Sequence, residues 1–332
     1  MTERADVHLN PSEIELLRHS TIGVTGATGF LGRHVLDVLL PYGAKICAVA
    51  RHPGLLPPGI SFQVGDLRNP ADCEAFVQGC DFVIHLAALG GGFHANLNRD
   101  FVLLTDNLIM SFQLLRAAVG AGVQRYVYVS SSAVYGRRTG KLQEDDAGPP
   151  FLTSELGFAM AKWTAEEQLR MASQGGQIHG IIVRPTNPYG PYDTLKVENA
   201  HFISSVILRL LQQNIHQLEL RGNPAIHRNF VYGGDVGLGI VLALLRGKSG
   251  QAYNLGAHEN HTLEEVVSSV IELMGLSGFS VRYDTTAPAG HPGRLPDLGR
   301  VRQELGYNPE VGLDEGLRRT VEWYRSTVTQ IQ

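Results

Sequence analysis

Three glycines, Gly26, Gly29 and Gly32, stand at intervals of three residues in the stretch Thr25–Gly32. The first permits a tight turn, the second lets the backbone approach a pyrophosphate, and the third lets a helix pack closely on a strand. A helix N-terminus offers unpaired N–H groups and the positive end of a dipole, and both favour phosphate. The residues predicted to make this dinucleotide site are Gly26, Thr28, Gly29, Phe30, Leu31 and Gly32. The alternative is an ordinary glycine-rich loop.

The segments on either side of these glycines decide between the two interpretations. The apolar run Thr21–Val24 predicts a strand before the first glycine. The pattern Arg33–Leu40 predicts a helix after the last one, closed by Pro41 and Gly43. A strand, a glycine turn and a helix in this order make a phosphate site, so we favour the dinucleotide interpretation.

The same alternation continues along the first half of the chain. Further strands are predicted at 44–50, 61–64, 81–86, 125–130 and 178–183, with helices at 70–78, 99–121 and 155–173 between them. This alternation is typical of an α/β fold in which helices cover both faces of a parallel sheet. The sequence therefore predicts a Rossmann-type doubly wound parallel sheet.

Five residues fall at the carboxyl ends of predicted strands: Gly26, Arg51, Asp66, Ala87 and Ser131. In sheets of this kind a ligand binds beyond the carboxyl ends of the strands. Because parallel strands all end at one edge, we expect these five residues to converge on one crevice.

From about Asn187 the pattern loosens, since proline and glycine interrupt it repeatedly. Helices are expected at 200–213, 235–246, 262–275 and 313–326, and the capping box Thr262–Glu265 opens the third. We predict an N-terminal extension at 1–20, with one short helix from Pro11, and a dinucleotide-binding domain at 21–186. Residues 187–332 are expected to form a smaller mixed α/β substrate lobe, interleaved with the first domain.

The composition excludes several classes of protein. Of 332 residues, 43% are hydrophobic and 18% charged, and the formal net charge is -4. Without a basic excess we expect no nucleic-acid partner, and without a long uninterrupted apolar run we expect no membrane span. The three cysteines lack metal-like spacing, and the N-terminus lacks the cationic and apolar regions of a signal peptide. These features predict a cytoplasmic protein without a metal site.

Five segments together carry a resemblance to a known family: Asp66-Leu67, Ser130–Gly136, Arg184–Pro191, His227–Tyr232 and Leu305–Pro309. With the glycine stretch, they make the chain after residue 20 resemble the extended short-chain dehydrogenase/reductases that modify nucleotide sugars. The resemblance implies an NAD(P)-dependent enzyme with a nucleotide-sugar substrate. It also implies that the dinucleotide contacts Asp66, Leu67, Ala87 and Ala88.

A closer resemblance is to the branch of GDP-fucose synthase and GDP-mannose 3,5-epimerase. The segment Gly90–Asn96 is similar to that branch's glycine loop near the sugar, which implies a substrate contact for Gly91. The segment Glu198–Ile203 resembles the stretch where the synthase keeps an acid/base histidine, which implies that role for His201 and a substrate contact for Asn199. The alternative for His201 is a helix-start histidine hydrogen-bonded to the backbone.

The family reaction moves a hydride between a nicotinamide and C4 of the hexose. The resemblance implies that Ser131 hydrogen-bonds the reacting hydroxyl, and that Lys162 binds the nicotinamide ribose and lowers the pKa of a neighbouring phenol. A solvated helix lysine is the alternative for Lys162, and a backbone cap is the alternative for Ser132. The expected substrate-binding residues are Gly91, Ser132, Asn187, Asn199, His201, Arg228 and Arg294. The two arginines would clamp the diphosphate, unless they are surface ion-pair partners.

The chain departs from the family at Phe158, because the family motif Tyr-x-x-x-Lys reads Phe158-Ala159-Met160-Ala161-Lys162 here. A phenyl ring cannot move a proton, and losing a general acid or base typically costs about 10²–10⁴ in rate. The protein could be a deliberately disabled form that traps bound substrate. It could instead use His201, Tyr135 or Tyr192, or it could bind without catalysis. We favour the first account.

Two further departures from the family motifs reduce the number of reactions that we expect of this chain. Ala133 stands where the epimerising branch carries a cysteine base, so epimerisation at C3 and C5 is disfavoured. A 4,6-dehydratase usually has Thr-Asp-Glu where this chain has Ser131-Ser132-Ala133, so dehydration is disfavoured too. We predict hydride transfer at C4 of a hexose, linked to GDP, by a 4-ketoreductase or an epimerase. The alternatives are an NDP-sugar dehydratase and a non-catalytic dinucleotide-binding regulator.

The cofactor and the assembly complete the expectations. NAD binders commonly carry an acid at the end of the second strand, where this chain has Ala50-Arg51, and Arg33 follows the last glycine. Two cations near the ribose 2′ position favour NADP over NAD. The resemblance also implies a homodimer formed through helices 99–121 and 155–173.

Overall fold

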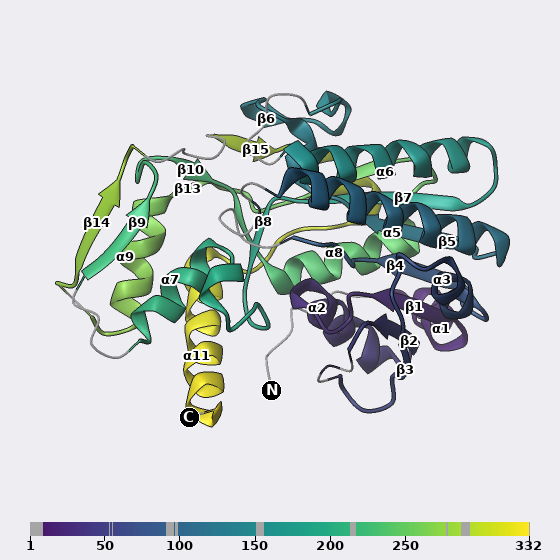
Figure 1. Ribbon diagram of the computed structural model, residues 1–332, viewed down its shortest axis with the longest axis horizontal. Helices are drawn as coiled ribbons and strands as arrows, with labels where there is room; N and C mark the ends of the chain where they lie inside the picture. Colours follow the sequence, from purple (N-terminus) through teal and green to yellow (C-terminus); the bar gives the residue numbers. More distant parts are fainter. Residues whose placement is uncertain are drawn as a thin grey trace.

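The computed structural model describes residues 9–52, 54, 56–90, 96, 99–150, 156–212, 217–276, 278–286 and 293–331. They form a seven-stranded parallel sheet with a smaller lobe beside it (Figure 1). The strand order is β12-β7-β5-β4-β1-β2-β3. The strands are β1 (Thr21–Thr25), β2 (Lys45–Ala50), β3 (Ser61–Val64), β4 (Phe82–His85), β5 (Arg125–Val129), β7 (His179–Pro185) and β12 (Ala252–Leu255). The predicted Rossmann-type doubly wound sheet is confirmed.

Strand β12 was not predicted from the sequence. It pairs in parallel with β7, with Tyr253 beside Val183, and all four of its residues are buried. The helix α8 (Gly233–Arg246) precedes it and packs on the same sheet. One sheet is therefore built from chain segments on both sides of residue 187.

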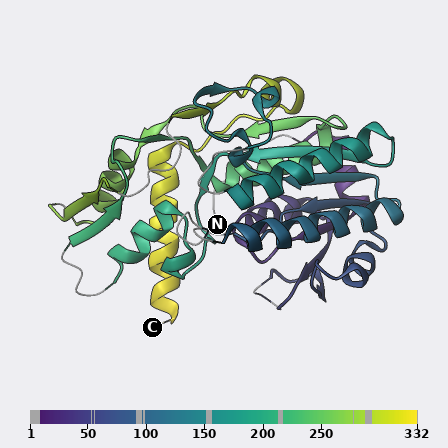
Figure 2. The ribbon, with the colours of Figure 1, turned by 45° about the horizontal axis from the view of Figure 1, so that its top comes forward.

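Two apolar clusters cover the two faces of the sheet. The first contains residues of α1 (Pro11–His19), α2 (Phe30–Leu39), α8 and α10 (Gly299–Leu305). The second contains residues of α3 (Pro70–Val77), α5 (Asp100–Gly120) and α6 (Leu156–Gln174). Figure 2 shows α5 and α6 side by side along their length.

Helix α5 has the length and hydropathy of a membrane span, judged by composition alone. In the fold it packs against α6 and α3, and Leu103, Leu114 and Ala118 are completely buried. One side of the helix is therefore part of the protein core, and 39% of the apolar span is buried.

Helix α1 begins at Pro11, as predicted, and Asn10 and Glu13 close its first turn as a capping box. Glu13 also pairs with Arg246 of α8, with 2.6 Å between Oε1 and Nε, and Leu17 is completely buried. Helix α1 is thereby attached to α8 and to the apolar cluster on this face of the sheet.

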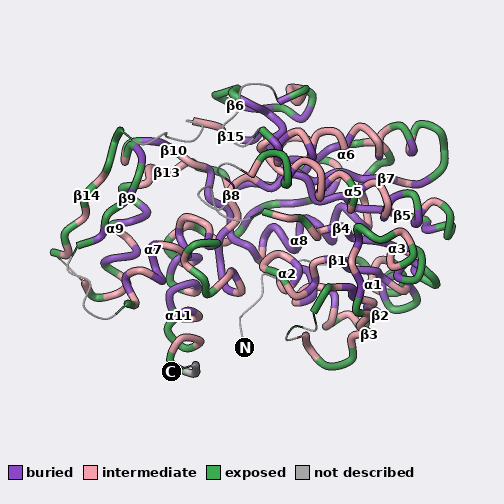
Figure 3. Tube along the Cα trace, viewed as in Figure 1, coloured by how far each residue is buried: buried purple, intermediate pink, exposed green. Residues whose placement is uncertain are grey.

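The smaller lobe has its own apolar cluster. Helices α7 (Phe202–Leu210), α9 (Leu263–Leu273) and α11 (Leu313–Ile331) share this cluster with the parallel pair β9 (Gln217–Arg221) and β14 (Ser280–Asp284). Helix α9 begins at the predicted capping box. Buried and exposed residues alternate along β9, as Figure 3 shows. One face of this pair therefore packs on the lobe while the other carries polar residues.

Candidate functional site

The glycine turn between β1 and α2 is closed tightly. Gly26 has a φ of 68°, in the left-handed region, and a Cβ on Gly32 would lie 2.1 Å from the carbonyl oxygen of Gly26. Gly29, which has no side chain to cap the helix, is the N-cap of α2. The N–H groups of the first helical turn therefore face the position where an anion would bind. The helix begins at Phe30, three residues before its predicted start.

A cavity of about 1480 Å³ extends from this turn to the smaller lobe. Its lining includes the five strand-end residues, Gly26, Arg51, Asp66, Ala87 and Ser131, so their predicted convergence is confirmed. Most of the other predicted site residues line it too: Thr28, Gly29, Phe30, Leu31, Gly32, Leu67, Ala88, Ser132, Phe158, Lys162, Asn187, His201, Arg228 and Arg294. A cradle of this shape, with glycine at each close approach, fits a dinucleotide.

Three predicted site residues do not join this group. Gly91 lies outside the described residues. Asn199, in the short helix η4 (Val197–Asn199), is described but is not part of the cavity lining, although its neighbours Glu198 and Ala200 are. The expected contact of Arg33 with the dinucleotide is also unsupported. Its guanidinium lies over the ring of Tyr192, 5.0 Å from the centroid, and the described lining does not include it.

At the end of the cavity beside β3, Asp66 is held by Arg68. The guanidinium donates to Asp66 Oδ2 at 2.6 Å and to Asp106 at 3.0 Å. This hydrogen bond from Arg68 holds the pKa of Asp66 at about 2, so the carboxylate is charged at neutral pH. Arg51 is exposed at the end of β2 and lines the same part of the cavity.

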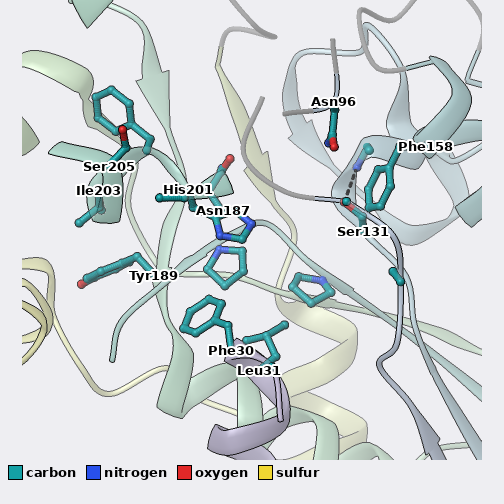
Figure 4. A pocket seen from close by; sticks show the side chains of 18 of the residues that line it. Phe30, Leu31, Asn96, Ser131, Phe158, Asn187, Tyr189, His201, Ile203 and Ser205 are labelled. Carbon is teal, nitrogen blue, oxygen red and sulfur yellow. Dashed lines mark hydrogen bonds between the residues drawn. The ribbon is translucent and has the colours of Figure 1, made fainter. Parts of the chain in front are cut away.

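Ser131 and Phe158 lie together on one side of the pocket (Figure 4). Ser131 Oγ accepts a hydrogen bond from the backbone N–H of Ala133 at 3.1 Å, so its own O–H is left to donate. Ser132, whose alternative role was that of a backbone cap, is the first residue of the short helix η2 (Ser132–Tyr135). It also lines the cavity.

Lys162 is a buried residue rather than a solvated helix lysine. Its Nζ donates to the carbonyl of Val129 at 2.7 Å and lies 5.7 Å from the centroid of the Phe158 ring. Burial lowers the pKa of this amine to about 8, against the opposing effect of Glu166. A cation at this place would favour the ionised form of a phenol at position 158.

The two tyrosines that could have replaced the missing phenol are excluded by their positions. Tyr135 is 3% exposed, and its hydroxyl donates to Asn254 Oδ1 at 2.5 Å and accepts from Arg184. Tyr192 packs against His34 and Trp323. Neither belongs to the described lining of the cavity.

His201 does line the cavity, at the start of α7. Figure 4 shows it with Asn187 on the side of the pocket away from Ser131 and Phe158. Its Nδ1 lies 3.1 Å from Oδ2 of Asp193, whose side chain is buried. The imidazole of His201 is therefore paired with a carboxylate.

The structure contains a buried ion pair close to the site that the sequence did not predict. Arg184, the first residue of the motif Arg184–Pro191, is completely buried and donates to both oxygens of Glu166, at 2.6 and 2.9 Å. Ser130 Oγ donates to the same carboxylate at 2.5 Å. These bonds join α6, which carries Phe158 and Lys162, to the ends of β5 and β7. The sequence offered no signal for a pairing across 18 residues.

The loop after β4 is held by hydrogen bonds from side chains of β1 and α5. Thr25 Oγ1 accepts hydrogen bonds from the backbone N–H groups of Leu86 and Ala87, at 3.1 and 3.0 Å. Asn107 of α5 exchanges hydrogen bonds with the backbone of Leu89, at 2.7 and 2.9 Å. The position of this loop is therefore set by a strand and a helix of the main sheet domain.

The far end of the cavity is rich in arginine. Arg294 donates to the backbone carbonyls of Ser132 and Gly136, so it also holds the loop that carries η2. Arg209, Arg221 and Arg282 line the cavity beside β9 and β14 and were not predicted from the sequence. Glu219 and Asp284 line the same end, and Arg282 pairs with Glu219 at 3.7 Å. The arginines outnumber these carboxylates, which favours an anionic ligand group.

The chain belongs to the NAD dependent epimerase/dehydratase family, whose family model matches residues 22–256. The resemblance inferred from the motifs is confirmed. The protein is therefore of the class of NAD-dependent epimerases, reductases and dehydratases that act on nucleotide sugars.

Individual relatives agree with this class. The chain is 26% identical over 338 residues to a putative GDP-L-fucose synthase 2 of Arabidopsis thaliana, with 99% of each chain covered. It is 27% identical to a dTDP-4-dehydro-6-deoxy-D-allose reductase of Streptomyces, covering 92% of this chain and 96% of that one. The structure of a double mutant of dTDP-glucose 4,6-dehydratase from Streptomyces venezuelae, with NAD bound, is similar with a TM-score of 0.82 at 29% identity, covering 93% and 98% of the two chains.

Proposed function

We propose that this protein is a cytoplasmic enzyme that transfers a hydride at C4 of a nucleotide-linked hexose, as a 4-ketoreductase or an epimerase. One observation carries the proposal: a single cavity joins the dinucleotide cradle to Ser131 and Lys162 and continues to an arginine-rich end. We propose GDP as the nucleotide, which the relatives named GDP-L-fucose synthase support.

We assign each side chain of the site a separate role in this reaction. A nicotinamide bound in the cradle supplies or accepts the hydride. Ser131 donates its O–H to the C4 oxygen, and buried Lys162 holds the ribose and stabilises negative charge nearby. Arg228 and Arg294 bind the diphosphate. With phenylalanine at position 158, His201 remains as the side chain that moves the proton.

A dehydratase and a regulator are the competing functions. Position 132 is a serine and position 133 an alanine, so the family's usual acids for dehydration are missing. A pure cofactor sensor has no use for the arginine-rich end. The test is calorimetric titration of the dinucleotide-loaded protein with GDP-, UDP-, CDP- and dTDP-hexoses, and with their 4-keto forms, followed by product analysis. Tight binding of one nucleotide sugar supports the enzyme, whereas binding of the dinucleotide alone would support the regulator.

We propose NADP rather than NAD as the cofactor, with Arg51 as the residue that selects it. Replacing Arg51 with alanine should weaken NADP binding by about tenfold, because one charge-assisted hydrogen bond to the 2′-phosphate is lost, and should leave NAD binding unchanged. Calorimetric titration with each dinucleotide measures this without a sugar substrate. Arg325→Ala, at an exposed position on α11, is the control. Tighter binding of NAD than of NADP by the unaltered protein would refute the assignment.

We also propose a homodimer formed through α5 and α6. Phe101 on α5 is 80% exposed and Met171 on α6 is 69% exposed, which leaves apolar surface on the two paired helices. Light scattering should give twice the chain mass of 36.2 kDa. The double replacement Phe101→Glu and Met171→Glu should give the single mass, while Val64→Glu on β3, at an equally exposed apolar residue, should not. A single-chain mass for the unaltered protein would contradict the dimer.

A further inference from the structure

The carboxylate of Asp193 is directed at the imidazole of His201. Nδ1 of His201 lies 3.2 Å from Oδ1 and 3.1 Å from Oδ2, and the backbone N–H of His201 lies 3.3 Å from Oδ2. Oδ1 also accepts from the backbone N–H of Thr194 at 2.8 Å. These contacts come from two backbone N–H groups and the imidazole, so the position of the carboxylate relative to the ring is set from several sides.

Asp193 is ionised although it is buried. Only 5% of the residue is exposed, and burial by itself raises the pKa of the carboxyl. The hydrogen bond and charge of His201 outweigh this effect and hold the pKa of Asp193 below its ordinary value. A buried negative charge therefore faces Nδ1 at neutral pH.

The segment 191–194 that carries Asp193 is anchored at both ends. His34 of α2 lies with Nε2 3.1 Å from the carbonyl oxygen of Pro191, and Tyr324 of α11 donates to the carbonyl of Thr194 at 3.1 Å. Between them Tyr192 has a φ of 72°, a left-handed conformation that costs a tyrosine about 1–2 kcal/mol. The rings of His34 and Trp323 hold Tyr192 in this conformation. The backbone that aims the carboxylate is therefore fixed.

From this geometry we propose that Asp193 is the positioning residue of His201. It accepts the Nδ1–H bond, so the neutral imidazole is held as the Nδ1–H tautomer with Nε2 as the atom that exchanges the proton. In the oxidising direction Nε2 takes the proton of the substrate hydroxyl, and in the reducing direction it returns that proton to the oxygen. The catalytic part of this proposal rests on the proposed function, whereas the tautomer does not.

The tautomer is measured directly by ¹⁵N NMR of the full chain labelled in its histidines. The signals of His201 are those lost in His201→Gln, and they should show a protonated Nδ1 and an unprotonated Nε2. In Asp193→Ala the ring should change to the Nε2–H tautomer that free histidine prefers. Tyr324→Phe, which loosens the same segment without touching the imidazole, is the matched control and should keep the Nδ1–H tautomer. An Nε2–H tautomer in the unaltered protein would overturn the proposal.

Turnover gives an independent measurement on the substrate identified by the calorimetric panel. Asp193→Asn should lower kcat by at least about tenfold with little change in KM, because the ring is no longer held for proton transfer. The same replacement in His201→Gln should have no further effect, since Asp193 acts through His201. A further loss in that background would assign Asp193 a separate structural role and overturn the proposal. If the tautomer is as expected but no hexose is turned over, the proposed function fails and the positioning of the imidazole stands.

Discussion

Tyrosine at position 158 should raise turnover at C4 by about 10²–10⁴ over the chain with phenylalanine. The Phe158 ring lines the cavity beside Ser131, and Lys162 Nζ lies 5.7 Å from the ring centroid. A phenol on this ring would reach the cavity, and the buried ammonium would stabilise its ionised form. The measurement is nicotinamide absorbance with the bound nucleotide sugar and its 4-keto form, for Phe158→Tyr beside the unaltered chain.

The control for this experiment is Phe158→Leu, which keeps an apolar side chain without a hydroxyl and should show no gain. A gain with tyrosine alone assigns the effect to the added O–H. If neither variant exceeds the unaltered chain while both bind the nucleotide sugar, the tyrosine position is not the missing acid/base. That result would favour either a mechanism that does not need the phenol or a binding role.

His201→Gln should lower the turnover of the Phe158 chain by about 10² or more, because it removes the imidazole to which we assign the proton transfer. Glutamine is close in size and its amide can still donate to Asp193, so the local packing is kept. The effect should fall on kcat rather than on KM, since the hydrogen-bonding position is retained while the proton transfer is not.

The same replacement should cost much less in the Phe158→Tyr background, where a phenol is available to move the proton. The four proteins form a double-mutant cycle, and the difference between the two losses measures how far the two side chains share one task. Equal losses in both backgrounds would assign His201 to another step, either substrate binding or proton transfer at a different carbon.

The dinucleotide half of the site was largely predictable because its signals are local. Gly26, Gly29 and Gly32 lie within seven residues. Gly26 is required by its φ of 68°, and Gly32 because a Cβ there would lie 2.1 Å from the Gly26 carbonyl oxygen. Strand ends in a parallel sheet all lie at one edge, so Asp66, Ala87 and Ser131 could be grouped before any contact was known.

Residues whose roles depend on distant partners were not predictable. Arg184 and Tyr135 lie in motifs that carry the family resemblance, yet both are buried in one hydrogen-bonded group with Glu166 and Asn254. Arg33 has the right place in the chain for a ribose contact, but the helix starts at Phe30 and its guanidinium lies over Tyr192. No local pattern carries that information, because each partner comes from a separate element.

The sequence by itself therefore determined six of the seven strands of the sheet, the glycine cradle and the absence of a phenol at position 158, since local spacing and side-chain chemistry decide these features. Only the tertiary structure decided which titratable groups share the cavity. It buried Tyr135 against Asn254 of β12 and Arg184 of β7. It also turned Tyr192 toward Trp323 and brought Asp193 to His201, because these two outcomes depend on how α2, α7 and α11 pack around one short segment. Packing between elements far apart in the chain sets such neighbours, and the pattern of any one element does not encode it.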